Sequence, residues 1–161
     1  MDNLRKEFES IKADYVKKYG FTVFDLRCVM EGKRLLLEGE VLLEPQAEYA
    51  KKIVKKHFSG QVLNQIKILS DRSSPPGFGY GVGKKVVTDI FRRPIEAFAK
   101  MSEAALSRHR ATQALKRDPP FRMLKEFGKW YLVQLVDNTL GWIRQSDTEK
   151  VKGCTVPEFR R

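Results

Sequence analysis

The stretch 120–143 constrains this chain most, because short apolar runs alternate there with residues that favour turns. Three such runs are separated by Phe127-Gly128 and by Asp137-Asn138. Punctuated runs of this kind are typical of strands joined by tight turns. Together with the apolar segments 86–91 and 113–115 upstream, they predict a small antiparallel barrel of about five strands.

Three aromatic residues of these runs are candidate ligand contacts. Trp130 and Trp142, the two tryptophans of the chain, stand beside β-branched or aromatic neighbours, and Tyr131 follows Trp130 directly. Such side chains suit a half-buried pleated surface, which favours core packing. Small β-barrels also use exposed aromatic side chains to recognise peptides, so a binding role for the three residues stays open.

The order of four short motifs gives these strands a family resemblance. The motifs are Asp89-Ile90-Phe91-Arg92-Arg93-Pro94, Thr112-Gln113-Ala114-Leu115, Trp130-Tyr131-Leu132-Val133 and Gly141-Trp142-Ile143. Over roughly 86–143 the chain resembles a bacterial SH3-like (SH3b) domain of the type that precedes the peptidase domain in NlpC-type cell-wall cysteine peptidases. The resemblance implies a non-catalytic module that binds or positions cell-wall peptide, without specifying the ligand.

The segment 94–110 interrupts this pattern with helical spacing, carried by Ile95, Phe98, Met101, Ala105 and Leu106. The spacing predicts a helix inserted in the first long loop of the barrel, with its apolar face against the strands. Core packing is one interpretation of these residues, and a lid that contacts the ligand is the other.

In the first 70 residues, segments with the apolar spacing of a helix alternate with segments that have the apolar spacing of a strand. A helix over the start of the chain is predicted by Leu4, Phe8, Ile11 and Tyr15, and Gly20 ends it. A hairpin follows, with apolar alternation from Phe24 to Met30 and from Leu35 to Val41, a turn at Glu31-Gly32-Lys33 and a weak point or bulge at Gly39. A second helix from Pro45 to Phe58 and a strand from Val62 to Ile68 complete an αββαβ order.

This α+β module resembles a BON domain (bacterial OsmY and nodulation), a small module of envelope proteins. The resemblance rests on Val29, Gly32, Leu37, Gly39 and Val41, and on the helix and strand that follow them. It implies contact with phospholipid or with partner proteins, and it brings no catalytic residue.

Between the two modules lies a segment rich in glycine and proline, which we expect to be a flexible linker over 71–83. Gly79, Gly81 and Gly83 are spaced by two, but no strand-to-helix context and no Gly-Lys-Ser/Thr accompany them, which argues against a phosphate-binding loop. The expected organisation is therefore an α+β domain over 1–70, the linker, an all-β SH3-like barrel over 84–145, and a polar extended tail over 146–161.

The residues that could support catalysis or metal binding are few. The two cysteines, Cys28 and Cys154, form no disulfide framework, and no histidine follows Cys154, because His57 and His109 lie upstream. No close ligand pair such as Cys-x-x-Cys is present. We therefore expect no enzyme activity, no metal site and no cofactor. The enzyme alternative is a fragment or relative of a cell-wall peptidase whose catalytic domain is absent here.

The charge balance favours an anionic partner. The formal net charge is +11, and residues 84–161 contribute 17 basic and 9 acidic side chains, a net of +8. The candidate contacts are Arg92, Arg93, Arg108, Arg110, Lys116 and Arg117. If they converge on one side of the barrel, they form an anion-binding surface. A solvated basic surface without a ligand is the alternative.

Together these observations predict a non-catalytic adaptor that binds envelope or cell-wall peptide or polymer and positions a protein partner. A basic nucleic-acid-binding protein is the second alternative, and it rests on charge alone. No apolar run approaches the ~20 residues of a membrane span. The N-terminus has no apolar signal core, so we expect no export signal, whereas both resemblances imply the cell envelope.

Overall fold

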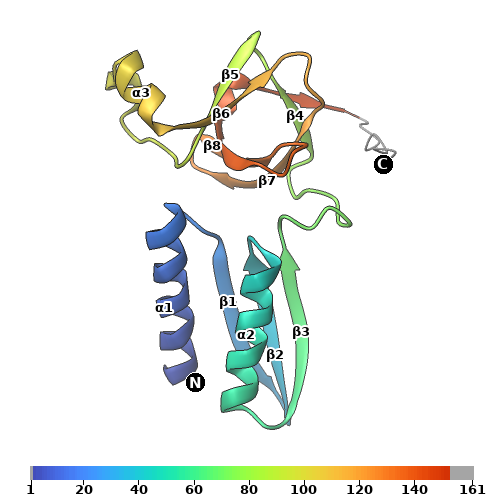
Figure 1. Cartoon of the computed structure of the whole chain (residues 1–161). Coiled ribbons are helices and arrows are strands. Elements are labelled where there is room, and N and C mark those ends of the chain that lie inside the picture. Colours follow the sequence, from blue (N-terminus) through green and yellow to red (C-terminus); the bar gives the residue numbers. More distant parts are fainter. Residues whose placement is uncertain (1, 153–161) are drawn as a thin grey trace. The chain divides into compact units, whose positions relative to one another are not determined.

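The computed structural model describes residues 2–152 and shows a mixed α+β protein with a three-stranded and a seven-stranded sheet (Figure 1). The chain divides into two compact units, Met1–Ser74 and Pro75–Arg161, and each unit contains one of the sheets. No helix among the described residues is long and apolar enough to cross a membrane.

The N-terminal unit has the αββαβ order that the sequence predicts. Its elements are α1 (Asp2–Tyr19), β1 (Phe24–Glu31), β2 (Arg34–Val41), α2 (Glu44–His57) and β3 (Gln61–Ile68). The sheet order is β1-β2-β3, with β1 antiparallel to β2 and β3 parallel to it. Consequently β1 and β3 are the two edge strands of this sheet.

Both helices bury the apolar stripes that their periodicity predicts. Leu4, Phe8 and Ile11 of α1 lie in one core cluster with Ala50 and Val54 of α2. The inward side chains of β2 belong to the same cluster, and Gly20 ends α1 with a positive φ of 85°.

Two polar contacts fix α2 at its ends. Buried Gln46 accepts a hydrogen bond from the Leu43 amide at 2.8 Å and donates one to Thr22 Oγ1 at 2.6 Å. At the other end His57 Nε2 lies 2.6 Å from Glu7 Oε1 of α1, and this hydrogen bond holds the pKa of Glu7 below its ordinary value of 4.5. The first contact ties α2 to the residues just before β1, and the second ties it to α1.

The expected bulge at Gly39 is absent. The β1–β2 register runs without a shift from the pair Phe24–Val41 to the pair Glu31–Arg34. Gly39 has a φ of 126°, and a Cβ atom built on it would collide with the carbonyl oxygen of Asp25. Glycine is required here by the close approach of the two backbones rather than by an extra residue in the strand.

The described part of the C-terminal unit contains seven antiparallel strands, two more than the sequence predicts. They are β4 (Tyr80–Gly83), β5 (Val87–Phe91), β6 (Arg110–Leu115), β7 (Phe121–Phe127), β8 (Trp130–Gln134), β9 (Leu140–Arg144) and β10 (Thr148–Val151), in the order β10-β4-β7-β8-β9-β5-β6. Its core contains apolar side chains of β5–β9, among them Ile90, Met123 and Ile143.

The sheet curls round on itself (Figure 1) but is not a closed barrel, and in this respect the prediction is wrong. Within residues 2–152 no pairing joins β10 or β4 to β6. A cavity of about 200 Å³ lies where the two sides approach, lined on one side by Val82 and Gly83 and on the other by residues 112–115. The two sides therefore approach each other at this seam without pairing.

The linker and the tail also differ from the prediction, because each contains a strand. Strand β4 pairs with β7 and with β10, so residues 80–83 belong to the sheet and not to a linker. A Cβ atom on Gly81 would meet Phe121 and Thr148, and one on Gly83 would meet Thr88. These glycines admit neighbouring side chains into a tightly curved sheet, and they are not flexible spacers.

The inserted segment between β5 and β6 is less helical than predicted. It contains the single turn η1 (Phe98–Lys100) and the seven-residue helix α3 (Glu103–His109), and neither has a buried residue. The predicted apolar residues of α3, Ala105 and Leu106, are half-buried and not fully buried. Contact with the sheet comes from half-buried Phe98, whose ring centroid lies 5.4 Å from that of Phe91 and 5.8 Å from that of Trp130.

Candidate functional site

The three candidate aromatic residues are buried in the C-terminal unit. Trp130, Tyr131 and Trp142 are only 6%, 7% and 5% exposed. Trp130 packs edge-on against Phe91, Trp142 packs edge-on against Phe127, and Tyr131 lies beside Phe78. Their rings are used for packing, so none of the three offers an open face to a ligand in this structure.

Arg110, one of the six candidate cations, is paired within the sheet. Its Nε lies 2.7 Å from Asp89 Oδ1, and its Nη2 donates to Asp89 Oδ2 at 2.9 Å. Gln113 Nε2 donates to the same carboxylate at 2.8 Å. This two-point contact between guanidinium and carboxylate neutralises the charge of Arg110, so it is a poor candidate for polymer binding.

The other five candidate cations are exposed. They are Arg92, Arg93, Arg108, Lys116 and Arg117, and in the described part of the chain none of them forms an ion pair. Their charges are therefore available to a ligand.

The register of β5 and β6 separates these five residues into two groups. Val87 is opposite Leu115 at one end of the ladder, and Phe91 is opposite Arg110 at the other. Arg92, Arg93 and Arg108 lie at the second end, where the Arg92 amide donates to the His109 carbonyl at 2.9 Å. We call these three residues the insertion cations.

Lys116 and Arg117 lie at the first end, beside a pair of lysines. The Lys116 amide donates to the Val86 carbonyl at 3.0 Å, which places Lys116 next to the segment that contains Lys84 and Lys85. We call Lys84, Lys85, Lys116 and Arg117 the tip cations. Lys84 Nζ donates to the Ser146 carbonyl at 2.9 Å, and Lys85 Nζ lies 3.7 Å from Asp147, so two of the four have local contacts.

Sequence reasoning missed the apolar part of the tip. Val86 is 76% exposed and Val87 is 42% exposed, although both belong to a segment that predicts a barrel strand. The signal was present in the sequence, because Lys84-Lys85 directly precedes the two valines and lysine is depleted in strands. The tip thus combines cations with exposed apolar surface.

The two groups of cations are separated by roughly 20 Å, because strands rise about 3.3 Å per residue and six residues separate Val86 from Arg92. The interval contains the neutralised Arg110–Asp89 pair. An extended anionic chain could contact both groups, whereas a small anion could contact only one.

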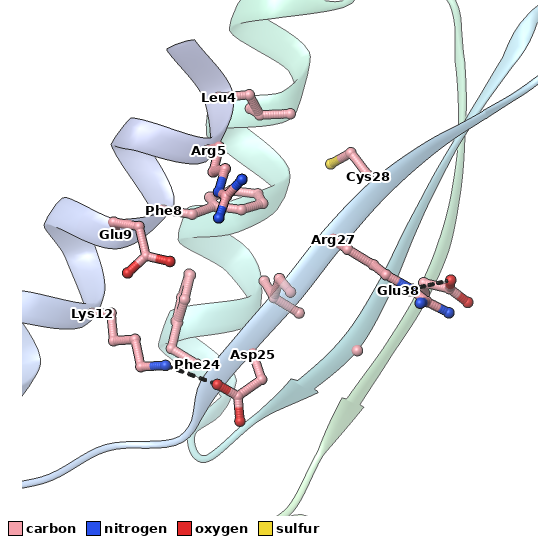
Figure 2. A pocket seen from close by; sticks show the side chains of 12 residues that line it. Leu4, Arg5, Phe8, Glu9, Lys12, Phe24, Asp25, Arg27, Cys28 and Glu38 are labelled. Atoms are coloured by element: carbon pink, nitrogen blue, oxygen red, sulfur yellow. Dashed lines mark hydrogen bonds and ion pairs between the residues drawn. The ribbon is translucent and has the colours of Figure 1, made fainter. Parts of the chain in front are cut away.

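A second concave surface lies in the N-terminal unit (Figure 2). It is a groove of about 760 Å³ between α1 and β1, and charges of both signs line it. Lys12 Nζ contacts Asp25 Oδ1 at 2.9 Å, and Arg27 Nε contacts Glu38 Oε1 at 2.6 Å. The mixture of charges gives this groove no preference for anions.

The groove also contains Cys28, and its thiol is poorly suited to nucleophilic chemistry. Partial burial raises the pKa of Cys28 above its ordinary value of 9.0, which keeps the thiol protonated at neutral pH. Cys154, the other cysteine, lies outside the described residues. Among residues 2–152 no group of three or more histidine, cysteine, aspartate or glutamate side chains is arranged to hold a metal ion.

Comparison of this chain with protein-family models, with curated proteins and with solved structures gave no match.

Proposed function

We propose that this protein is a non-catalytic binding protein whose C-terminal unit holds an extended anionic polymer along the β5–β6 hairpin. The observation that carries the proposal is the placement, at both ends of this ladder, of exposed cations that form no ion pair with any residue of 2–152. Arg92, Arg93 and Arg108 lie at one end, and Lys116 and Arg117 at the other. Arg110, at the insertion end of the ladder, adds no free charge because it is paired with Asp89.

A polymer suits this arrangement better than a small anion does. An isolated exposed ion pair contributes little free energy, about 0–1 kcal/mol. A polyanion that contacts several cations at once releases condensed counterions, and its second contact forms at a high effective concentration. Binding should therefore depend steeply on salt and on polymer length.

The choice of polymer follows from the resemblance to SH3b domains and from the buried aromatic residues. Proteins that bind single-stranded RNA commonly stack bases on exposed aromatic side chains. Trp130, Tyr131 and Trp142 are buried, so they provide no such platform. This favours a wall polymer such as teichoic acid over RNA. In this proposal the C-terminal unit is an SH3-like module, the N-terminal unit is a BON-like module, and the protein positions a partner at the cell envelope.

The test measures binding of fluorescent teichoic acid at salt concentrations from ~50 to ~200 mM, with RNA of matched charge as a competitor. Two charge-reversed variants are compared, Arg92→Glu with Arg93→Glu and Lys116→Glu with Arg117→Glu. Each should weaken binding and reduce the slope of log K against log salt by at least about 2, since each removes two phosphate contacts.

A matched control changes the net charge by the same amount in the N-terminal unit, through Lys6→Glu with Lys52→Glu, both exposed residues. This variant should bind as the parent does. Equal losses in all three variants would mean that net charge alone attracts the polymer, and absence of binding at low salt would refute the proposal. Preference for RNA in competition would refute the choice of wall polymer.

A further inference from the structure

The two edges of the three-stranded sheet differ in character. The exposed residues of β3 are polar, namely Gln61, Asn64, Gln65 and Lys67. Strand β1 instead exposes Val29 and Met30, which are 41% and 48% exposed. Among the described residues no strand pairs with the outer edge of β1. An edge strand with exposed apolar side chains is a template for pairing with another strand, and natural proteins usually protect such edges.

The charges around Val29 form a self-complementary pattern. Counting outward from Val29, Arg27 and Glu31 are two residues away on either side, and Asp25 and Lys33 are four residues away. If a second copy of β1 pairs antiparallel about a two-fold axis at Val29, Arg27 faces the partner's Glu31 while its Nε keeps the contact with Glu38 of β2. The same register brings the partner's Lys33, which lies in the hairpin turn just beyond the end of β1, near Asp25. Opposite charges directly across strands stabilise a sheet.

Neighbouring registers lack this complementarity. A two-fold axis at Cys28 would bring Asp25 against the partner's Glu31, and an axis at Met30 would bring Arg27 against the partner's Lys33. Like charges directly opposite each other destabilise a strand pair. Odd-numbered and even-numbered residues of β1 point to opposite faces of the sheet. A register that pairs an odd-numbered residue with an even-numbered one would therefore place the helices of the two copies on opposite faces of the joined sheet. The pattern therefore favours the axis at Val29 over its neighbours.

The apolar side chains of β1 also favour a two-fold axis at Val29. Val29 is opposite Leu36 of β2, and Leu36 is opposite Leu63 of β3, so the three side chains form a row across one face of the sheet. At a two-fold axis Val29 would meet the partner's Val29, and the row would continue through both copies. Cys28 and Met30 would meet across the helix-covered face.

We propose that two copies of this protein associate through β1 about this axis and form a continuous six-stranded sheet. The groove between α1 and β1 then receives the hairpin turn of the other copy (Figure 2). Asp25 lines that groove and is half-exposed, so its carboxylate can accept the partner's Lys33 in addition to Lys12. This proposal concerns the N-terminal unit and is independent of polymer binding by the C-terminal unit.

The position of α1 leaves room for this pairing. Figure 2 shows Leu4 at the level of Cys28 and Lys12 at the level of Asp25, so α1 runs away from Val29 as the chain proceeds. A two-fold axis at Val29 sends the α1 helices of the two copies in opposite directions along the joined strands. Each helix thus runs toward the other copy's hairpin turn, and only its first turn, which includes Asn3 and Leu4 beside Met30, lies near the axis.

Disulfide trapping of the full-length chain tests both the association and its register. In a background of Cys28→Ser with Cys154→Ser, Val29→Cys should form a disulfide-linked dimer under mild oxidation. Residues that pair across antiparallel strands have Cα atoms about 4.5–5.5 Å apart, within the range that a disulfide spans. Arg27→Cys alone and Glu31→Cys alone should form no disulfide-linked dimer, but an equimolar mixture of these two variants should form cross-linked dimers.

The matched control is Gln65→Cys on the polar edge strand β3, which should not cross-link above the level of random collisions. Sedimentation velocity over a concentration series provides a second readout, since Val29→Lys places two like charges at the axis and should abolish association. The proposal would be overturned if Val29→Cys and Gln65→Cys cross-linked equally. It would also be overturned if Arg27→Cys cross-linked as well alone as in the mixture with Glu31→Cys. A parent protein that stays monomeric at every concentration, with no cross-link through Val29→Cys, would overturn it as well.

Discussion

Gly39 is the residue at which the β1–β2 hairpin tolerates no side chain. Its φ of 126° lies in a region that other residues rarely adopt, and a Cβ atom would collide with the Asp25 carbonyl. We expect Gly39→Ala to lower the free energy of unfolding of the N-terminal unit by about 1–3 kcal/mol or more, the usual range for a strained backbone position. Urea denaturation followed by circular dichroism measures this loss.

Gly32 provides the comparison, because it has a positive φ of 61° but no atom within 4 Å of an added Cβ. Asparagine adopts this left-handed conformation more readily than other residues do. Gly32→Asn should therefore cost much less than Gly39→Ala. A similar loss in both variants would show that backbone conformation alone matters and that the close approach at Gly39 does not.

Single residues also show where sequence reasoning about the candidate site fails. Arg110 and Arg108 look alike in the sequence, yet Arg110 is paired with Asp89 from a different strand, and Arg108 is exposed. The pairing depends on the β5–β6 register, which composition does not reveal. The burial of Trp130 and Trp142 was one of two open interpretations, and only the packing of the curled sheet decides between them.

At the scale of elements, the sequence predicts best where one face is buried and the other is solvated. The helices α1 and α2 and the strand β1 follow this pattern, and their apolar residues repeat with the expected periods. The central strand β2 buries Leu36 on one face and Leu35 and Leu37 on the other. Strands β4 and β10 do not. Gly81 and Gly83 take the inward positions of β4, and β10 has two exposed charged residues, Glu149 and Lys150. A strand without apolar alternation resembles a linker or a tail until its partners are known.

The pairing of β10 predicts how the chain responds to shortening. A chain that ends after residue 145, at the expected border of the tail, loses β10 and leaves β4 unpaired on one side. It also loses the burial of Thr148 against Gly81. We expect the melting temperature of the C-terminal unit to fall by at least about 5 °C, since each kcal/mol shifts it by about 4–8 °C in a small domain. Calorimetry measures the shift.

A chain that ends after residue 152 is the control, because it keeps every strand that the structure describes. Its C-terminal unit should melt within about 2 °C of the full chain. If the chain ending at residue 145 melts at the same temperature as this control, β10 contributes nothing to stability and residues 146–152 are a tail after all.

On the scale of the whole molecule, the described residues form two core clusters, one in each unit, that share no residue. One comprises buried side chains from residues 4–54 and the other comprises buried side chains from residues 90–143. We therefore expect the fragments 1–74 and 75–161 to fold separately, each with a cooperative thermal transition. The melting temperature of each fragment should match one of the two transitions of the full chain, as measured by calorimetry.

A fragment that is unfolded alone but folded in the full chain would contradict this expectation. It would mean that one unit needs the other for its stability. Adding the missing fragment in trans would then restore the transition, and titration with that fragment would show how strongly the two units depend on each other.

The pairing of β4 with β10 has a mechanical consequence for the C-terminal unit. Because the first strand of the unit is antiparallel to the last, Tyr80 is opposite Val151, so the chain enters and leaves the unit at neighbouring points. A pulling force applied at these two points opens the ladder one residue pair at a time, beginning at Tyr80 and moving toward the pair Gly83–Thr148. Such unzipping requires much less force than sliding whole strands past each other, so under tension this unit should yield first at the β4–β10 pair.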